Sequence, residues 1–323
     1  MSAVMTVGVD VGSSHISIAC GDRVVWCPNV AGRPSDFVAR KLFGEGWTVG
    51  ERALEGYPAL ELCYPVRNGL IDRVNRDAAL EAIGAVVTDL LGQIGVEKGA
   101  MAVVGVSPLA LRSQRELFLN LFEGFFERVM LAPSTFLAGY AEGNISRVVV
   151  MDLGAGTVDI TPLHGAIPSP EDHVVLRTGG DYLDHKIYEL FSDAYPDLPC
   201  STTIARQWKE RKASFQDDTV EVDVLTLEGV KRVRIGHILR KACESLIPVI
   251  KKGLREVLEQ LPPERWDVYL GNVLLTGRTA LIKGFPGRLI DALTFPGNVG
   301  VKLVGHPDSA VAIGAAMFAE EVF

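Results

Sequence analysis

Two short stretches of the sequence combine an aspartate with a turn of small residues, a pattern suited to binding phosphate. We call them loop one (residues 10–14: Asp10, Gly12, Ser13, Ser14) and loop two (residues 152–157: Asp152, Gly154, Ala155, Gly156, Thr157). Small residues let backbone N–H groups approach a phosphate closely, and the hydroxyls of Ser13, Ser14 and Thr157 add donors. Each aspartate ends an apolar run, where its carboxylate could hold Mg²⁺ through the water shell of the ion.

The two loops belong to an internal repeat. Residues 7–18 can be laid on residues 149–160, with identities at Val7/Val149, Asp10/Asp152, Gly12/Gly154 and Ile18/Ile160. Both copies are typical of a β-hairpin, with an apolar strand, a small-residue turn and an alternating second strand. One such turn is a weak signal, but two copies at equivalent places indicate a duplicated α/β lobe. Neither copy is a Walker loop, because the sequence has no GxxxxGK[ST].

The segments around the loops alternate between strand and helix patterns, which indicates a mostly parallel or mixed sheet in each lobe. A chain of 323 residues predicts two lobes of roughly 150 residues each. We expect strands at residues 102–106, 148–151 and 273–276, and helices at 75–94, 113–125, 202–215, 237–261 and 308–321. The helix at 237–261 should lose regularity at Pro248.

Composition excludes several classes of partner. A net charge of −8 and a pI near 5.4 argue against nucleic-acid binding, which needs a basic face. Five cysteines without a CxxC pair fit a reduced, cytoplasmic setting. The chain has no apolar run of 18 residues free of charges and turn formers, so we expect no direct membrane insertion.

The paired loops resemble the two phosphate loops of the actin, sugar-kinase and heat-shock-chaperone superfamily. Residues 274–284 resemble the adenosine loop of that superfamily, and residues 307–316 resemble its last connecting helix. Residues 49–51 and 62–71 look like actin proper, and residues 64–71, 168–175 and 179–184 look like the magnetosome-associated bacterial actins. The resemblance runs from about Val7 to Ala316.

This resemblance implies an α/β, two-lobed actin-like fold of duplicated ribonuclease-H-like lobes with a nucleotide cleft between them. Lobe I would be residues 1–133, with subdomain IA and a small IB insert near 32–65. Lobe II would be residues 134–303, with IIA and a IIB insert near 179–244, and residues 304–323 would return to lobe I.

The resemblance also implies ATP and Mg²⁺ as ligands, with Asp10 and Asp152 at the metal and catalytic positions. It assigns further nucleotide contacts to seven residues: Gly179, Asp181, Lys209, Glu210, Gly277, Arg278 and Thr279. For Lys209, a solvated helix face is the alternative. Arg278 and Thr279 stand where glycines are usual, and their Cβ atoms limit backbone approach to a nucleotide. Arg278 could instead reach a phosphate or stack on adenine, or simply be exposed.

Ser134 is a second departure, because related actins place a catalytic glutamate there. A serine is shorter and is not a base near neutral pH, so we expect ATP binding with slow hydrolysis.

The function implied is an actin-like cytoskeletal ATPase that polymerises with itself and organises magnetosomes or another intracellular cargo. Another bacterial actin and a magnetosome linker protein are further expected partners. Apolar residues of IB, namely Phe37, Leu42 and Phe43, could pack between subunits. One alternative is a catalytically weakened structural paralogue that co-assembles with another actin. Another is a small-molecule kinase, which would need a base such as Asp159 or Asp181 beside a sugar pocket.

Overall fold

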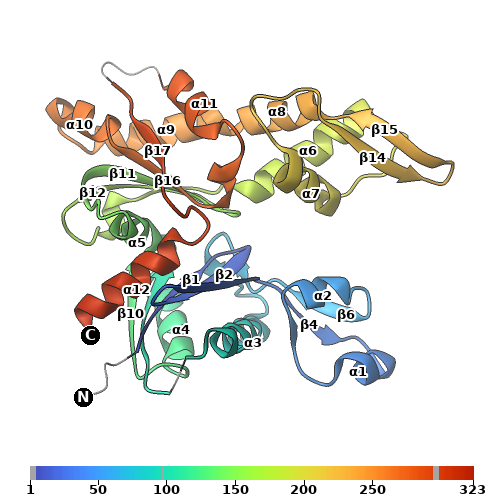
Figure 1. Cartoon of the computed structure of the whole chain (residues 1–323), viewed down its shortest axis with the longest axis horizontal. Coiled ribbons are helices and arrows are strands. Elements are labelled where there is room, and N and C mark those ends of the chain that lie inside the picture. The colour runs from blue at the N-terminus through green and yellow to red at the C-terminus, as the bar shows by residue number, and fades with distance from the viewer. Residues whose placement is uncertain (1–4, 97, 294–297) are drawn as a thin grey trace. The chain divides into compact units, whose positions relative to one another are not determined.

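The computed structural model describes residues 5–96, 98–293 and 298–323, which separate into two compact units (Figure 1). Unit one comprises Met1–Ser146, Leu163–Glu171 and Val304–Phe323, and unit two comprises Arg147–Pro162 and Asp172–Leu303. These two units match the expectation of two lobes, while the predicted limits of each lobe stay predictions. The finer limits of the four subdomains stay predictions.

Unit one is built on a five-stranded mixed sheet in the order β10-β9-β1-β2-β3. Its strands are β1 (Thr6–Val11), β2 (His15–Cys20), β3 (Arg23–Pro28), β9 (Met101–Val106) and β10 (Arg128–Pro133). β1 pairs antiparallel with β2 and parallel with β9, β2 pairs antiparallel with β3, and β9 pairs parallel with β10. Loop one therefore lies at the carboxyl end of β1, where the hairpin turns.

Helices cover both faces of this sheet (Figure 1). On one face, α12 (Ala310–Val322) lies against β1 and α5 (Ser134–Ala141). The approach is so close that a Cβ atom on Gly8 would collide with the backbone at Ala312. On the other face, α3 (Arg76–Ile94) and α4 (Arg112–Phe122) bury a core with alternate residues of β1, including Val7 and Val9.

Two smaller groups of strands complete unit one. A three-stranded sheet in the order β5-β4-β6 is accompanied by two short helices, and β7 pairs antiparallel with β8. These elements are β4 (Ala31–Pro34), α1 (Phe37–Phe43), β5 (Thr48–Val49), α2 (Glu51–Glu55), β6 (Leu60–Cys63), β7 (Val66–Arg67) and β8 (Leu70–Ile71). The side chain of Asp36 caps α1 by accepting a hydrogen bond from Ala39 N at 2.8 Å.

Unit two repeats the sheet of unit one strand by strand, in the order β13-β12-β11-β16-β17. The strands are β11 (Ser146–Leu153), β12 (Val158–His164), β13 (Val174–Leu176), β16 (Val273–Thr276) and β17 (Val301–Leu303). β12 pairs antiparallel with β13, while β11 with β16 and β16 with β17 pair parallel, as their counterparts do in unit one. The duplicated lobe predicted from the repeat is thus present.

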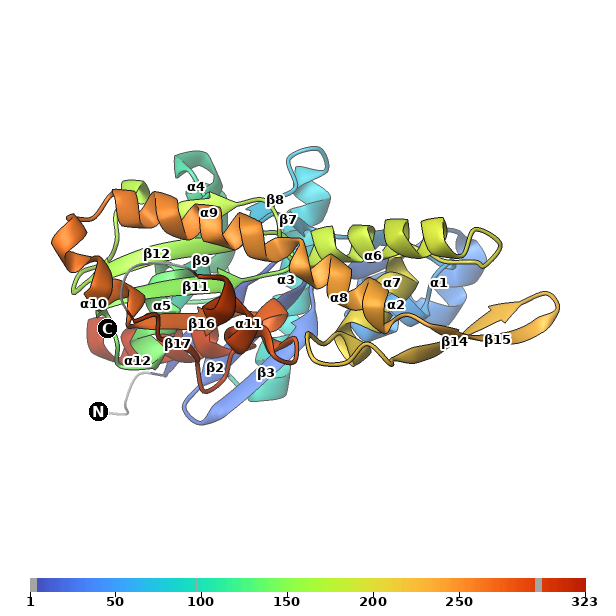
Figure 2. The same cartoon turned by 90° about the horizontal axis from the view of Figure 1, so that it is seen from above.

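The helix expected over residues 237–261 is two helices, α8 (Gly236–Glu244) and α9 (Leu246–Glu259). The break falls at Ser245 and not at Pro248 as predicted. Pro248 is the third residue of α9, in the first turn, where backbone N–H groups have no partner within the helix, so its missing N–H costs little. Figure 2 shows α9 lying along the sheet of unit two beside β12, and its apolar side chains join the core of that sheet.

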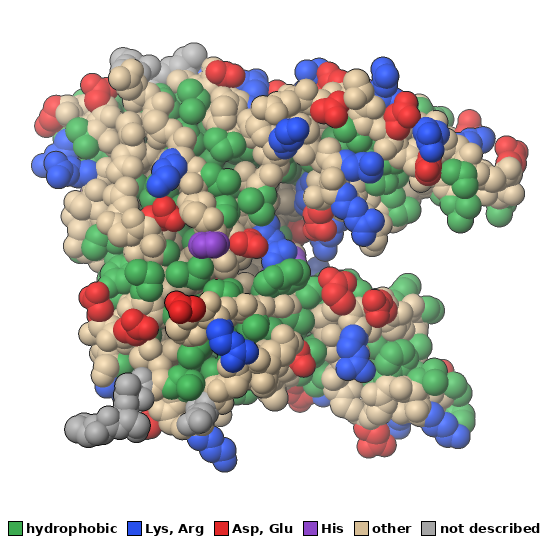
Figure 3. Space-filling model, viewed as in Figure 1, with side chains coloured by type: hydrophobic (Ala, Val, Ile, Leu, Met, Phe, Trp, Pro, Cys, Tyr) green, Lys and Arg blue, Asp and Glu red, His purple; other side chains and the backbone are tan. Residues whose placement is uncertain are grey.

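A second core in unit two joins α6 (Gly180–Ala194), α7 (Thr202–Lys212), α8 and the hairpin of β14 (Glu221–Thr226) and β15 (Gly229–Arg234). The hairpin exposes Leu225, Leu227 and Val230, and hydrophobic side chains near its tip lie among acidic and basic ones in Figure 3. The remaining helices of unit two are α10 (Trp266–Leu270) and α11 (Phe285–Ala292). Within the described ranges, each helix is too short or too polar to cross a membrane.

Candidate functional site

Loop one is held by its own hairpin and by Asn29, which follows β3. Gly12 N donates a hydrogen bond to His15 O at 2.9 Å, which closes the hairpin. The amide nitrogen Nδ2 of Asn29 donates to Gly12 O at 2.8 Å, and the main-chain nitrogen of Asn29 donates to Ser14 O at 2.8 Å. Asn29 is only 1% exposed. One buried residue thus fixes two carbonyl groups of the loop.

The side chain of Ser13 contacts the turn between β7 and β8. Gly69 N donates to Ser13 Oγ at 2.9 Å, so the serine hydroxyl keeps its own proton for another acceptor. Gly69 has φ +73°, and a Cβ atom there would lie 2.5 Å from the Cβ of Ser107. Position 69 therefore requires glycine, and this glycine brings its N–H to loop one.

Loop two is closed in the same way and is held by the start of α6. Gly154 N donates to Thr157 O at 2.9 Å, which matches the closing bond of loop one. Gly180 N donates to Gly154 O at 3.0 Å, and Asp181 N donates to Ala155 O at 2.8 Å. The first N–H groups of α6 have no acceptor within the helix. They find acceptors in the carbonyl groups of loop two.

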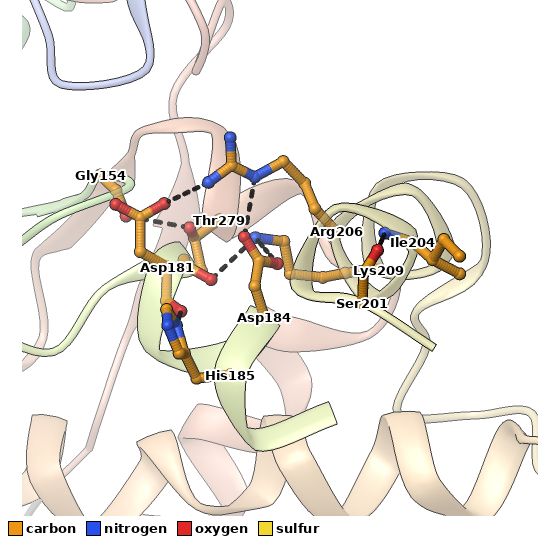
Figure 4. A network of polar contacts seen from close by, with 10 residues as sticks. Gly154, Asp181, Asp184, His185, Ser201, Ile204, Arg206, Lys209 and Thr279 are labelled. Carbon is orange, nitrogen blue, oxygen red and sulfur yellow. Dashed lines mark hydrogen bonds and ion pairs between the residues drawn. The ribbon is translucent and has the colours of Figure 1, made fainter. Parts of the chain in front are cut away.

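Thr279, from the predicted adenosine loop, contacts loop two. Its Oγ1 donates to Gly154 O at 3.1 Å, and its side chain is 6% exposed (Figure 4). Gly179 lies against the same backbone, because a Cβ atom there would lie 2.7 Å from Gly154 O. Arg278 is half-buried at the start of a 3₁₀ turn, Arg278–Leu281. The alternative that Arg278 is simply exposed is therefore wrong.

Asp152 is the penultimate residue of β11 and lies beside Gly277, the residue that follows β16. Asp152 pairs in register with Thr276, and a Cβ atom on Gly277 would lie 2.6 Å from the Oδ1 atom of Asp152. Desolvation by burial raises the pKa of the Asp152 carboxyl to about 6. A nearby cation would offset this cost, so the carboxylate fits a metal-associated role.

Asp10 occupies the corresponding place in unit one, half-buried at the end of β1. It pairs in register with Gly105 of β9, which pairs with Ala132 of β10. Ser134 follows two residues later as the first residue of α5 and is 6% exposed. Asp10 and Ala132 are therefore two strands, or about 10 Å, apart across the sheet, and Ser134 lies just beyond the end of β10.

The described residues contain no group of three or more His, Cys, Asp or Glu side chains placed to hold a metal ion. Magnesium is commonly held by one or two carboxylates together with water and the phosphates of a substrate. Asp10 in unit one and Asp152 in unit two each present a single carboxylate, which is the kind of ligand that such sites use.

Lys209 is not on a solvated helix face, so that alternative is wrong. Its side chain is 10% exposed, and Nζ lies 2.6 Å from Asp184 Oδ1 and donates to Gly180 O at 2.8 Å. Arg206 Nε donates to Asp184 Oδ2 at 2.9 Å, and Arg206 Nη2 donates to Asp181 Oδ1 at 3.0 Å (Figure 4). Glu210 is exposed.

Asp184 and Arg206 were missed in the sequence. The available signal was spacing, because Asp181 and Asp184 stand three residues apart on α6, as do Arg206 and Lys209 on α7. Such pairs share one helix face, so two acidic and two basic residues could have been matched. The network joins α6, α7 and the carbonyl of Gly180 beside loop two.

The predicted site residues thus form one group in each unit. In unit two, Asp152, loop two, Gly179, Asp181, Lys209, Gly277 and Thr279 adjoin one another, while Glu210 faces solvent. In unit one, Asp10 and loop one lie together, and Ser134 lies farther along the same edge.

The chain is similar to known actin-like proteins over almost its whole length. A sequence model of the family described as "MreB/Mbl protein" matches residues 138–323. The actin-like protein MamK of Magnetospirillum gryphiswaldense is 29% identical over 98% of this chain and 89% of the relative. A MamK-like protein of Paramagnetospirillum magneticum is 28% identical over 99% of this chain and 95% of the relative.

Two solved structures of MamK are similar to this chain over nearly its whole length. A MamK double helical filament superposes with a TM-score of 0.93 at 26% identity and covers 99% of both chains. A non-polymerising MamK mutant bound to AMPPNP has a TM-score of 0.75 at 26% identity, over 98% of this chain and 99% of the other. The expected two-lobed actin-like fold is confirmed.

Proposed function

Because the chain belongs to the MreB/Mbl family of actin-like proteins, we propose that it is a cytoskeletal ATPase that binds ATP with Mg²⁺ and polymerises into filaments. The observation that carries this proposal is the pair of equivalent hairpins. Each has an aspartate as the penultimate residue of its first strand. Each closes a small-residue turn with a 2.9 Å bond, from Gly12 to His15 and from Gly154 to Thr157. Such turns present backbone N–H groups to phosphate.

The chemistry proposed for the site divides among the residues of the two units. Backbone N–H groups of loop one and loop two, with the hydroxyls of Ser13 and Thr157, bind the phosphates. Asp10 and Asp152 would hold Mg²⁺ through its water shell, and the ion would supply positive charge beside the phosphates. Lys209 and Glu210 lie by the adenine and ribose, Gly179 and Asp181 lie near the ribose and phosphates, and Gly277 and Arg278 border the nucleoside. Thr279, of the same loop, supports loop two through its bond to Gly154 O.

Hydrolysis is proposed to be slow because Ser134 replaces a carboxylate. A serine hydroxyl can hold a water molecule, but it does not accept a proton near neutral pH. Loss of one group that positions the attacking water typically costs roughly 100-fold in rate. Ser134 also favours a second candidate function, a structural paralogue that hydrolyses little and co-assembles with another bacterial actin.

Self-association is proposed to be head-to-tail, because a heterologous contact that does not close generates a filament. MamK forms a double helical filament, and here α1 offers Phe37 and Leu42, which are 65% and 73% exposed, as apolar contact residues. The proposed setting is the cytoplasm, with magnetosomes or another organelle as cargo, attached through a linker protein.

Sedimentation of the purified protein tests the proposal. Wild type is incubated with ATP, ADP or no nucleotide in magnesium buffer, and the pelleted fraction is measured. A pellet that depends on ATP supports the nucleotide-driven filament. Equal pellets in all three conditions support the structural paralogue, and no pellet alone or with a second bacterial actin contradicts both.

Phe37→Asp and Leu42→Asp test the contact surface, with Leu225→Asp on the exposed β14–β15 hairpin as the matched control. The first two substitutions should abolish the ATP-dependent pellet without reducing ATP binding. If they sediment like wild type, α1 lies outside the filament contact.

A further inference from the structure

We propose that Asn29 and Thr279 are positioning residues, which orient the phosphate-facing amide groups of loop one and loop two. This inference rests on the proposed function and assigns a role to two side chains that do not themselves touch phosphate. Asn29 and Thr279 are almost fully buried, at 1% and 6% exposure. The side chain of each donates a hydrogen bond to a loop carbonyl.

The two side chains act on equivalent atoms. Gly12 and Gly154 occupy the same place in the repeated hairpins, and each uses its own N–H to close its hairpin at 2.9 Å. The carbonyl of Gly12 accepts from Asn29 Nδ2 at 2.8 Å, and the carbonyl of Gly154 accepts from Thr279 Oγ1 at 3.1 Å. In each unit, the donor comes from a segment outside the hairpin.

Peptide geometry turns this contact into an orientation of the next amide. The peptide group is planar and trans, so its C=O and the N–H of the following residue point in opposite directions. A bond that holds the Gly12 carbonyl therefore directs the Ser13 N–H to the opposite side. A bond that holds the Gly154 carbonyl directs the Ala155 N–H in the same sense.

Other hydrogen bonds hold further carbonyl groups of each loop. In loop one, the main-chain nitrogen of Asn29 also holds the carbonyl of Ser14 at 2.8 Å. In loop two, Gly180 N shares the carbonyl of Gly154 with Thr279, and Asp181 N holds the carbonyl of Ala155. The carbonyl sides of both turns are thus occupied by protein donors, and an anion would meet the N–H sides.

The chemical consequence is a fixed pair of donors. Amides that are already oriented bind an anion without the cost of ordering them, and they do not present carbonyl oxygen to it. Without the side-chain donor, the glycine peptide is held less firmly, because glycine has access to a wide range of backbone angles. In loop two, the bond from Gly180 N to Gly154 O remains and limits the loss. The loss should fall on phosphate binding, not on nucleoside binding.

Thr279 gives the sharper test, because two substitutions separate shape from hydrogen bonding. Thr279→Val keeps the shape and removes the donor, whereas Thr279→Ser keeps the donor. Affinities for ATP and AMP are measured by competition titration in magnesium buffer. Thr279→Val should weaken ATP about fivefold and AMP less than twofold, and Thr279→Ser should stay within twofold of wild type for both.

Asn29→Leu provides the test in loop one, since it removes the donor at similar size. It should also lower the ratio of ATP to AMP affinity about fivefold. Thermal unfolding without nucleotide checks that both variants are folded. Equal weakening of ATP and AMP, or an unchanged ratio in the folded variants, would overturn the inference. Failure of wild type to bind ATP would instead remove the proposed function on which it rests.

Discussion

The ammonium nitrogen of Lys209 lies 2.6 Å from the Oδ1 atom of Asp184, whose side chain is only 2% exposed. The other oxygen of that carboxylate accepts from Arg206 Nε at 2.9 Å. Asp184 therefore sets the orientation of two basic side chains of α7 from α6. Lys209 is directed to the carbonyl of Gly180, beside loop two, rather than to solvent.

Removing the charge of Asp184 should destabilise the protein. Asp184→Asn leaves Lys209 and Arg206 without their buried counter-ion, and breaking such a pair from one side costs about 3 kcal/mol. Urea unfolding measures the change. Asp193→Asn, at an exposed position of the same helix, is the control and should change stability by less than about 0.5 kcal/mol. Equal effects of the two substitutions would mean that the Asp184 network contributes nothing to stability.

Gly277→Ala should lower stability by at least about 2 kcal/mol, because its backbone angles of φ 86° and ψ 152° are open almost only to glycine. The added Cβ atom would also press on the Asp152 carboxylate. Gly287→Ala in α11 is the matched control, since its Cβ would meet no atom within 4 Å. A helical alanine there should be neutral or stabilising by up to about 1 kcal/mol. Thermal or urea unfolding of both variants distinguishes them, and a Gly277→Ala protein as stable as wild type would exclude this backbone constraint.

The contribution of His173 to the free energy of unfolding should fall between pH 7 and pH 5. Burial lowers the pKa of His173 to about 4, against the opposing effect of Asp172, and its Nδ1 lies 2.7 Å from Thr161 Oγ1. The unfolded imidazole titrates near pH 6.5, so the unfolded state binds more protons below that pH. The stabilisation is therefore complete above pH 6.5 and is lost toward pH 4.

At pH 5 the loss should be about 1 to 2 kcal/mol. His173→Asn cannot take up this proton, so its unfolding free energy should fall less than that of wild type between pH 7 and pH 5. Parallel pH profiles for the two proteins would show that His173 titrates normally.

Ser134→Glu should raise the rate of ATP hydrolysis, by up to roughly 100-fold, because a carboxylate can position and activate water. Ser134→Ala is the control and should stay near the wild-type rate. Phosphate release measures both, and circular dichroism confirms folding, since the site is 6% exposed. An unchanged rate in a folded Ser134→Glu protein would place the catalytic position elsewhere.

Local sequence patterns were enough to predict the two equivalent hairpins, one in each unit. The identities at Asp10/Asp152 and Gly12/Gly154 predicted two equivalent hairpins, and both close with the same hydrogen bond. Binary pattern and turn residues act over a few residues, so such features can be read directly from the chain. The division into two units followed from length and repeat together.

Contacts between distant segments could not be predicted in the same way. Asn29 lies 17 residues from Gly12, and Thr279 lies 125 residues from Gly154, yet each donates to the glycine carbonyl. Such a pairing leaves no periodic pattern in the sequence, because it depends on how the folded helices and strands pack against one another. The helix break was predicted at Pro248 but lies at Ser245. The prediction assumed that proline interrupts a helix, whereas proline is tolerated in the first turn.

ATP uptake by loop one and loop two tests the proposed function most directly. Isothermal titration of ATP into wild-type protein in magnesium buffer should give saturable binding of one nucleotide per chain, weakened at least tenfold by Asp10→Ala. No detectable uptake by the wild type, or uptake unaffected by Asp10→Ala, would contradict it.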